Sequence, residues 1–416
     1  MHSHFNNTLL DLPELSATKI HKEDDHFLFE VEPVEHTQDC PICGFSQTIR
    51  RGVAYSRRVR HLPAFGRRVY LLLPAIRLSC NRCLASFVWQ YDCVASKKRY
   101  TKLFEASLSK HAIGATITHA ARITETPATT LNRVVSAWME TESERVQQVC
   151  QEQAETSKNL VLGIDDFAIR KGHSYNTGLH DLRNNTFLEV IPGRTIEELL
   201  AYFANHPTWR ALQPCAVVMD LAKSYHTFIQ TMYPDALRIA DRFHVNRYVT
   251  EALQDMRKQV QHTQSTQSPF AKKDLKKHFR ILGKRHDQLS SEERRILKRL
   301  LSYSKDLRKV YEWKETFIVW YDCSPSYEMG KKRFVHWIHQ GKAIQHAIVD
   351  KCLKTMENWQ EEICNYHKFR FTNAAVEGKN NKIKALQRRH YFTRNTDHYK
   401  QYILLECNEE LIHYSS

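Results

Sequence analysis

The succession of predicted strands and helices between residues 159 and 241 is the feature that most constrains the fold of this chain. Three strand-like segments come first, "NLVLGIDDFAI", "HSYNTGLHDL" and "TFLEVIPG", and a turn joins the last two. A helical segment, the buried strand "CAVVMD", a second helical segment and the strand "ALRIAD" follow. This order predicts an α/β domain in which helices flank a mixed β-sheet.

Two aspartates stand on strands that this order brings together. The succession is the one that an RNase H-like fold requires, and that fold places the first strand, with Asp165, beside the fourth, which ends at Asp220. Paired carboxylates hold Mg²⁺ or Mn²⁺, and a third carboxylate from a helix completes a two-metal site. We therefore predict Asp165 and Asp220 as catalytic metal ligands. Asp166 competes with Asp165 for this role, and acids also end strands simply as turn residues.

The segment "TNAAVEGKNNKIKALQRR" combines one acid with many cations. If it is helical, it has a polar and an apolar face. The polar face carries Glu377, Asn381, Lys384 and Arg388, and the apolar face carries Val376, Ile383 and Leu386. We predict that Glu377 is the third metal ligand. The cations predicted to contact DNA phosphates are Lys379, Lys382, Lys384, Arg388 and Arg389. The simpler alternative is a first-turn acid that complements the helix dipole, with Asn373 as the cap.

Four of the eleven cysteines form two C-x-x-C pairs, Cys40 with Cys43 in "CPICG" and Cys80 with Cys83 in "CNRC". Two such turns aim four thiolates at one Zn²⁺ ion and leave no open position, so we predict a structural zinc site. A redox role for one pair is the alternative, but no βαβ pattern surrounds either pair. The segment between the pairs alternates apolar and basic residues like the paired strands of a zinc ribbon, and its arginines can reach a DNA backbone.

The segment "THAARITETPATTLNRVVSAWM" has the pattern of a helix-turn-helix. Thr126 suits the cap of the second helix, and Pro127 suits its first position. The buried stripe expected on that helix is Leu131, Val134, Val135 and Trp138. The outward-facing residues, which we predict to contact DNA, are Thr129, Thr130, Asn132 and Arg133. Many helical pairs that do not bind DNA share this pattern, so the prediction depends on the neighbouring zinc module and the basic charge.

Basic residues outnumber acidic ones and gather in clusters. Lys and Arg total 61 against 46 Asp and Glu, which gives a net charge of +15 and favours a polyanionic partner such as double-stranded DNA. Each cluster taken singly is also explained as a solvated helix face. The first residues lack the pattern of a secretory signal, and no apolar run is long enough to cross a bilayer. We therefore expect a cytoplasmic protein without a membrane partner.

The order of these motifs resembles that of a known family. The motifs "CPICG", "CNRC", "GIDDFAIRKGHSY", "VVMDLAKSY", "ADRFHV" and "TNAAVEGKNNKIKALQRR" are similar to those of bacterial insertion-sequence transposases of the DDE class, in the subgroup with an N-terminal zinc ribbon. The resemblance covers essentially the whole chain. It implies an RNase H-like core with Asp165, Asp220 and Glu377 as its acidic triad, a helical insertion before the glutamate, and association with the bacterial nucleoid. It also marks Asp241 and His244 as auxiliary site residues.

Five segments are expected along the chain. They are a zinc-binding, ribbon-like domain (1–96), a helix-turn-helix region (97–150), the first part of the RNase H-like core (151–246), a helical insertion (247–367), and the C-terminal helices of the core that carry the third acid (368–416). The insertion is predicted as helical because it is rich in Leu, Lys, Glu and Trp and has few turn signals.

One main hypothesis and three alternatives follow. The main hypothesis is a DNA transposase that binds the terminal inverted repeats of its element and cleaves and joins DNA with Mg²⁺ or Mn²⁺. Because two ends must be paired, we expect a homodimer or a higher homo-oligomer on DNA. The alternatives are a non-catalytic, zinc-containing DNA-binding regulator derived from a transposase, a metal-dependent nuclease without strand transfer, and a tyrosine recombinase that acts through Tyr391.

Overall fold

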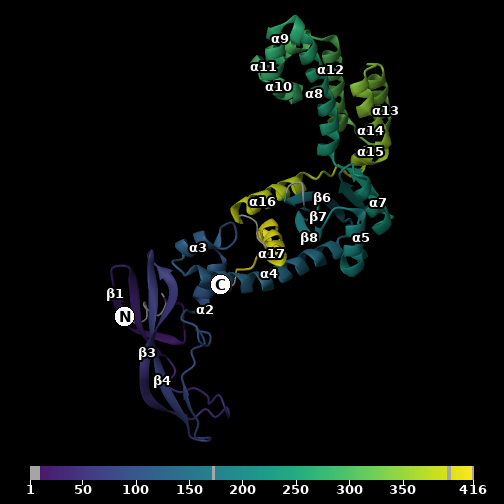
Figure 1. Cartoon of the computed structure of the whole chain (residues 1–416). Coiled ribbons are helices and arrows are strands. Elements are labelled where there is room, and N and C mark those ends of the chain that lie inside the picture. The colour runs from purple at the N-terminus through teal and green to yellow at the C-terminus, as the bar shows by residue number, and fades with distance from the viewer. Residues whose placement is uncertain (1–9, 171–173, 391–394, 415–416) are drawn as a thin grey trace. The chain divides into compact units, whose positions relative to one another are not determined.

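The computed structural model describes residues 10–170, 174–390 and 395–414 (Figure 1). The chain forms two compact units, Met1–Glu142 together with Leu411–Ser416, and Ser143–Glu410. Helix α4 (Ala128–Thr156) begins in the first unit and ends in the second. The five segment boundaries of the sequence analysis are finer than this division and stay predictions. Tyr391, on which the recombinase alternative depends, lies outside the described residues.

A five-stranded sheet forms the centre of the first unit. Its strands are β1 (Leu15–Lys22), β2 (His26–Pro33), β3 (Thr48–Ala64), β4 (Arg67–Cys80) and β5 (Ser86–Val88). The order is β1-β2-β4-β3 with β5 paired to β4; β2 runs parallel to β4, and the other pairs are antiparallel. The long β3–β4 hairpin is the pair of strands predicted between the two cysteine pairs. Alternate side chains along it, among them Val59, Leu71 and Leu73, are fully buried.

Helices follow this sheet within the first unit. They are α2 (Lys102–Ser109), α3 (Ile117–Ile123) and the start of α4. The hydroxyls of Thr101 and Thr116 cap α2 and α3 by accepting backbone N–H groups of the first turn. Trp138 of α4 is only half-buried. The other members of the predicted apolar stripe are buried, namely Leu131, Val134 and Val135. Two helices therefore occupy the region of the predicted helix-turn-helix.

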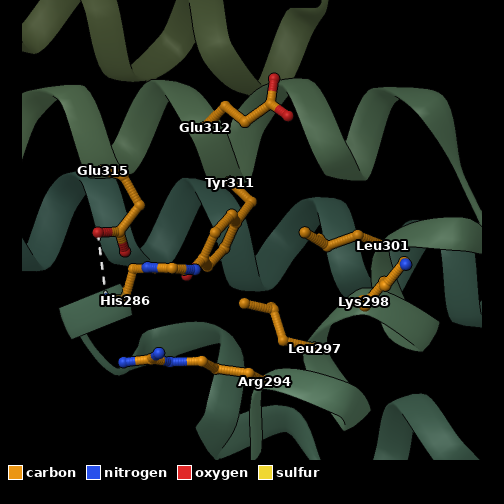
Figure 2. Close-up of a pocket in the computed structure, with 8 residues that line it drawn as sticks. All are labelled: His286, Arg294, Leu297, Lys298, Leu301, Tyr311, Glu312 and Glu315. Atoms are coloured by element: carbon orange, nitrogen blue, oxygen red, sulfur yellow. Dashed lines mark hydrogen bonds between the residues drawn. The ribbon is translucent and has the colours of Figure 1, made fainter. Parts of the chain in front are cut away.

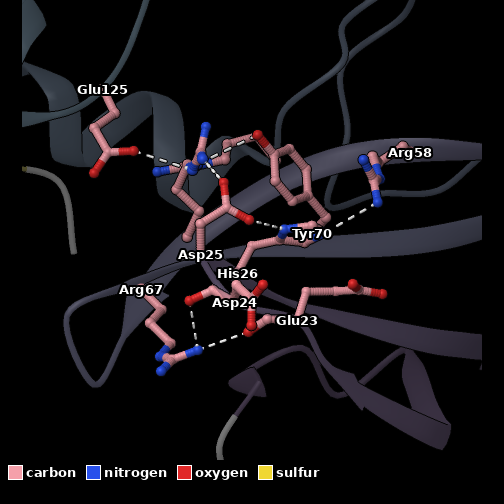
Figure 3. A network of polar contacts seen from close by, with 10 residues as sticks. Glu23, Asp24, Asp25, His26, Arg58, Arg67, Tyr70 and Glu125 are labelled. Carbon is pink, nitrogen blue, oxygen red and sulfur yellow. Dashed lines mark hydrogen bonds and ion pairs between the residues drawn. The ribbon is translucent and has the colours of Figure 1, made fainter.

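A polar network joins the β1–β2 turn, the β3–β4 hairpin and the turn between α3 and α4 (Figure 3). Arg68 pairs with Asp25, and its Nε lies 3.0 Å from Glu125 Oε2. Glu125 adopts a left-handed conformation (φ 48°) in the turn between the helices. Arg58 donates a hydrogen bond to the imidazole of His26 at 3.0 Å. Some arginines of the hairpin are therefore engaged within the protein, which leaves fewer of them to meet DNA.

The second unit contains the predicted α/β domain, whose sheet has the order β10-β9-β6-β7-β8. The strands are β6 (Val161–Arg170), β7 (Ser174–Asp181), β8 (Thr186–Pro192), β9 (Ala216–Met219) and β10 (Leu237–Ala240). β6, β7 and β8 pair in antiparallel fashion; β9 runs parallel to β6, and β10 runs parallel to β9. The predicted mixed sheet and its succession of strands are confirmed, and β6 and β9 are neighbours.

Helices from two parts of the chain pack on this sheet. The first group is α5 (Ile196–Asn205), α6 (Pro207–Ala211) and α7 (Lys223–Met232); the second is α16 (Ala374–His390), α17 (Thr396–Cys407) and the 3₁₀ turn η2 (Glu409–Leu411). α16 buries the predicted apolar face, which consists of Val376, Ile383 and Leu386. It approaches β6 closely (Figure 1) because Gly163 has no side chain: a Cβ there would lie 2.9 Å from Asn373 Oδ1 and from Val376 Cγ2.

The predicted helical insertion lies between β10 and α16. It comprises α8 (Arg242–Gln267), α9 (Pro269–Lys277), α10 (Phe279–Gly283), the 3₁₀ turn η1 (His286–Gln288), α11 (Ser291–Ser302), α12 (Lys305–Cys323), α13 (Tyr327–Lys342), α14 (Ala347–Asn358) and α15 (Gln360–Phe369). Trp313 and Trp337 stack with ring centroids 4.4 Å apart, and each indole N–H donates to the other residue's carbonyl oxygen. One hydrophobic cluster continues from these rings to Val218 of β9 and Ile239 of β10. The insertion therefore shares its core with the sheet.

A cavity of about 610 Å³ lies between α11 and α12 of this helical region (Figure 2). Leu297 and Leu301 supply apolar surface to its lining, whereas Arg294 and Lys298 supply cations. The backbone N–H of His286 donates to Glu315 Oε2 at 3.2 Å beside it. None of the residues predicted as ligands or DNA contacts lines this cavity.

Candidate active site and zinc site

Asp165, Asp220 and His244 form a compact group in the second unit. One ligand atom from each lies within 4.8 Å of the others. Asp165 is on β6, and Asp220 directly follows β9, the neighbouring strand. His244 is in the first turn of α8, which begins two residues after β10, and its Nε2 lies 3.1 Å from Asp220 Oδ1. The predicted pair of carboxylates is therefore brought together, with an imidazole beside it.

Burial and mutual repulsion make this pair unfavourable in its ionised form. Burial first, and then the charge of Asp166, raise the pKa of Asp165 to about 7. Burial and the charge of Asp165 raise the pKa of Asp220 to about 8. Within the described residues Asp220 Oδ1 makes no well-directed hydrogen bond, although His244 Nε2 is close. Two half-buried carboxylates and an imidazole that leave an acceptor unsatisfied fit a divalent cation, for which carboxylate oxygens are the preferred ligands.

Glu377 lies in the first turn of α16 and is exposed. It is not a member of the compact group of three, whose ligand atoms all lie within 4.8 Å of one another. The helix nevertheless contacts that group, because Asn380 Nδ2 donates to Asp165 Oδ2 at 2.7 Å. Residues three apart lie on one side of a helix, so Glu377 stands one turn before this contact. Burial lowers the pKa of His244, and the charge of Glu377 is among those that oppose this shift.

The four predicted zinc ligands lie together in the first unit. Cys40 Sγ is 3.6 Å from Cys83 Sγ, Cys43 Sγ is 3.6 Å from Cys80 Sγ, and all four sulfurs lie within 4.8 Å of one another. Four thiolates held at about 2.3 Å around a tetrahedral Zn²⁺ stand about 3.8 Å apart, so the spacing fits zinc. The backbone N–H groups of Cys83 and Arg82 lower the pKa of Cys80 to about 6, whereas burial and the other three cysteines raise the pKa of Cys83 to about 12.

Comparisons with known proteins decide the family. Residues 162–403 match a family model described as transposase, the ISL3 group of the DDE class. The chain belongs to the ISL3 family of DDE transposases. Residues 36–83 match a second model, described as the zinc-finger of transposase IS204/IS1001/IS1096/IS1165. The chain is also 26% identical over 345 residues to the transposase for insertion sequence element IS1001 of Bordetella parapertussis, which covers 82% of each chain.

The matched regions of this ISL3-family transposase include the predicted acidic triad and the predicted zinc ligands. The catalytic match begins in β6 and ends in α17, so it includes Asp165, Asp220 and Glu377. The zinc-finger match includes all four cysteines of the zinc site. The resemblance to insertion-sequence transposases with an N-terminal zinc ribbon is confirmed. Of the helices that the structure describes, none combines the length and the apolar character needed to span a membrane.

Two of the five cations predicted to contact DNA from α16 of the transposase face the protein instead. Lys379 is 7% exposed and donates from Nζ to the carbonyl oxygen of Asn185 at 2.5 Å. Arg389 makes two hydrogen bonds to the carboxylate of Glu406, at 2.6 and 3.1 Å. Because both charged groups already have partners inside the fold, the structure does not support phosphate contacts from these two side chains. The exposed cations of the set are Lys382, Lys384 and Arg388.

Contacts that sequence reasoning missed explain two of the other acids. Asp166, the competitor of Asp165, pairs with Arg194 Nη1 at 3.1 Å. Asp241, predicted as auxiliary, is buried and accepts a hydrogen bond from the backbone N–H of Asn373. Asn380 was missed as well, although its position three residues after Glu377 was a signal for it.

The residues predicted to read DNA from the helix-turn-helix lie at the start of α4. Thr129, Asn132 and Arg133 are exposed, and Thr130 is half-buried. Arg133 donates a hydrogen bond to the hydroxyl of Tyr100. Three of the four side chains therefore point away from the core, while the guanidinium of Arg133 has a partner within the protein.

Proposed function

We propose that this transposase binds the terminal inverted repeats of its insertion sequence and catalyses metal-dependent cleavage and transfer of DNA strands in an RNase H-like domain. The observation that supports this is the convergence of Asp165 and Asp220 from adjacent strands, beside a helix that carries Glu377. The order of the five strands agrees with that fold.

Three carboxylates are the proposed ligands of Mg²⁺ or Mn²⁺. Asp165 and Asp220 would hold the cations, with Glu377 as the third carboxylate ligand. When bound, the ions activate the attacking water or 3′-hydroxyl and neutralise the leaving oxygen. His244 lies beside Asp220, with its Nε2 3.1 Å from Oδ1, and belongs to the same group of candidate ligand atoms. Asp165 enters the reaction already oriented, because its Oδ1 accepts the backbone N–H of Asp166 and its Oδ2 accepts the amide of Asn380.

DNA contacts come from both units in this proposal. On α16 the exposed cations Lys382, Lys384 and Arg388 hold the phosphate backbone. In the first unit the zinc ribbon and the pair α3–α4 act as the end-recognition module, with base contacts from the start of α4. The residues proposed there are Thr129, Thr130, Asn132 and Arg133. Pairing of the two element ends requires at least a homodimer.

The test compares cleavage and joining of DNA that carries both element ends, in Mg²⁺ or Mn²⁺, by the wild type and by Glu377→Gln. Glu361→Gln, which changes an exposed glutamate of α15, is the matched control. We expect the wild type and the control to cut and join, and Glu377→Gln to bind the ends without either reaction. Binding without any reaction by the wild type would favour the regulator, and cut products without joined ones would favour the nuclease.

A further inference from the structure

Helix α16 is held to the sheet at two points by residues that are not themselves proposed metal ligands. Asp241, which directly follows β10, is 2% exposed, and its Oδ1 accepts the backbone N–H of Asn373 at 3.0 Å. Nearly two turns inside the helix, Asn380 is 4% exposed and donates its amide to Asp165 Oδ2 at 2.7 Å. The helix that carries Glu377 is therefore fixed at its start and again just beyond the glutamate.

The contact at Asp241 satisfies a specific need of the helix. The first N–H groups of an α-helix have no partner within the helix, and this end carries the positive end of the helix dipole. Asp241 supplies an anionic acceptor from a strand end far away in the sequence. Asn373 also donates its side-chain amide to the carbonyl of Ile164 on β6 at 3.4 Å, and its own carbonyl accepts the N–H of Glu377 at 2.8 Å. Asn373 thus links β6, β10 and the first turn of α16.

The contact at Asn380 sets the orientation of Asp165. The backbone N–H of Asp166 binds Oδ1 at 2.8 Å, and Asn380 binds Oδ2, so both oxygens of Asp165 are held. A carboxylate oxygen that accepts one hydrogen bond keeps a lone pair for a metal. Asn380 is neutral, so it orients the carboxylate without adding a charge to a crowded acidic group. Its Oδ1 is buried without a hydrogen-bond partner in the described chain, a cost that a residue serving only helix packing need not bear.

We propose that Asp241 and Asn380 are positioning residues that fix α16 so that Glu377 reaches a metal held by Asp165 and Asp220. Asp241 acts through Asn373 at the start of the helix, and Asn380 acts through the carboxylate of Asp165. Neither contacts metal or DNA in this assignment. The inference rests on the proposed function of the three acids.

The test measures Mn²⁺ binding to the full-length protein by titration calorimetry, without DNA. Outer-sphere partners of metal ligands are worth about 10–100-fold in metal affinity. We expect Asn380→Ala and Asp241→Leu each to weaken Mn²⁺ binding about tenfold. Asp241→Asn keeps an oxygen that accepts the Asn373 N–H, so we expect a much smaller loss. Binding of element-end DNA without metal should be the same in all variants.

Two outcomes would overturn the positioning roles. One is wild-type Mn²⁺ affinity in Asn380→Ala. The other is a loss in Asp241→Asn as large as that in Asp241→Leu, because the charge itself would then be required, as in a ligand. If thermal melting shows that Asp241→Leu does not fold, Asn380→Ala decides alone. Glu377→Gln separates the two proposals: wild-type Mn²⁺ affinity in this variant contradicts the acidic triad, whatever the other variants do.

Discussion

The salt dependence of DNA binding tests which cations of α16 meet phosphates. On duplex DNA the logarithm of the binding constant falls against the logarithm of salt concentration with a slope of about 0.9 per neutralised phosphate. Three of the predicted cations are exposed, whereas Lys379 is bonded to the carbonyl of Asn185. Replacing Lys382, Lys384 and Arg388 together by Gln should therefore reduce the slope by about 2.7. Lys379→Met should leave the slope unchanged.

Fluorescence anisotropy with a labelled element-end duplex gives this slope directly. Titrations between about 50 and 200 mM KCl span the range over which a few lost contacts change affinity strongly. Divalent metal is omitted so that the DNA stays intact. Lys379→Met is the matched variant, because it removes a charge from the same helix and keeps a long apolar stem at a buried position. Thermal melting of each variant verifies that α16 remains folded.

The reasoning is refuted if Lys379→Met reduces the slope by about 0.9, as Lys384→Gln is expected to do. That result would place the Lys379 ammonium on a phosphate and not on Asn185. An unchanged slope in the triple variant would equally reject α16 as a DNA-contacting helix.

Three further predictions concern the stability of the two units. Cys80→Ser should lower the zinc content and the melting temperature of the first unit, as metal analysis and calorimetry will show, because a structural zinc needs all four thiolates. Gly163→Ala should destabilise the second unit by about 1–3 kcal/mol in urea unfolding, since its Cβ would lie 2.9 Å from Asn373 Oδ1. Hydrogen bonds from Arg299 hold the pKa of Asp274 at about 2, below the ordinary 3.8. This stabilisation, about 1–2 kcal/mol after allowance for solvent screening, is complete above the ordinary pKa and is lost as the pH falls towards 2. Asp274→Asn should flatten this part of the acid-unfolding curve.

Periodicity in the sequence predicted the sheet and the buried face of α16, because both depend on local patterns. The same periodicity places Lys379 on the buried stripe, because it lies three residues after Val376 and four before Ile383. Lys379 was predicted to contact DNA because it lies within a run of cations. Charge composition was here a weaker guide than helical position.

The contacts of the site could not be predicted in the same way, because they join distant parts of the chain. Asn380 meets Asp165 across 215 positions, and Asp241 meets Asn373 across 132. The pairing of Arg389 with Glu406 depends on how α17 docks beside α16. A single sequence shows which residues can form such pairs. Which pairs do form depends on how the helices pack on the sheet.

The shared core of the insertion and the sheet limits how this enzyme can be dissected. Val218, next to the strand end that holds Asp220, and Ile239 belong to the same apolar cluster as Trp313 and Trp337. Removing the helices of the insertion would expose the apolar side chains of β9 and β10 that they cover. A minimal nuclease module made by trimming this transposase would aggregate before it could be assayed, and the second unit should melt as one cooperative transition.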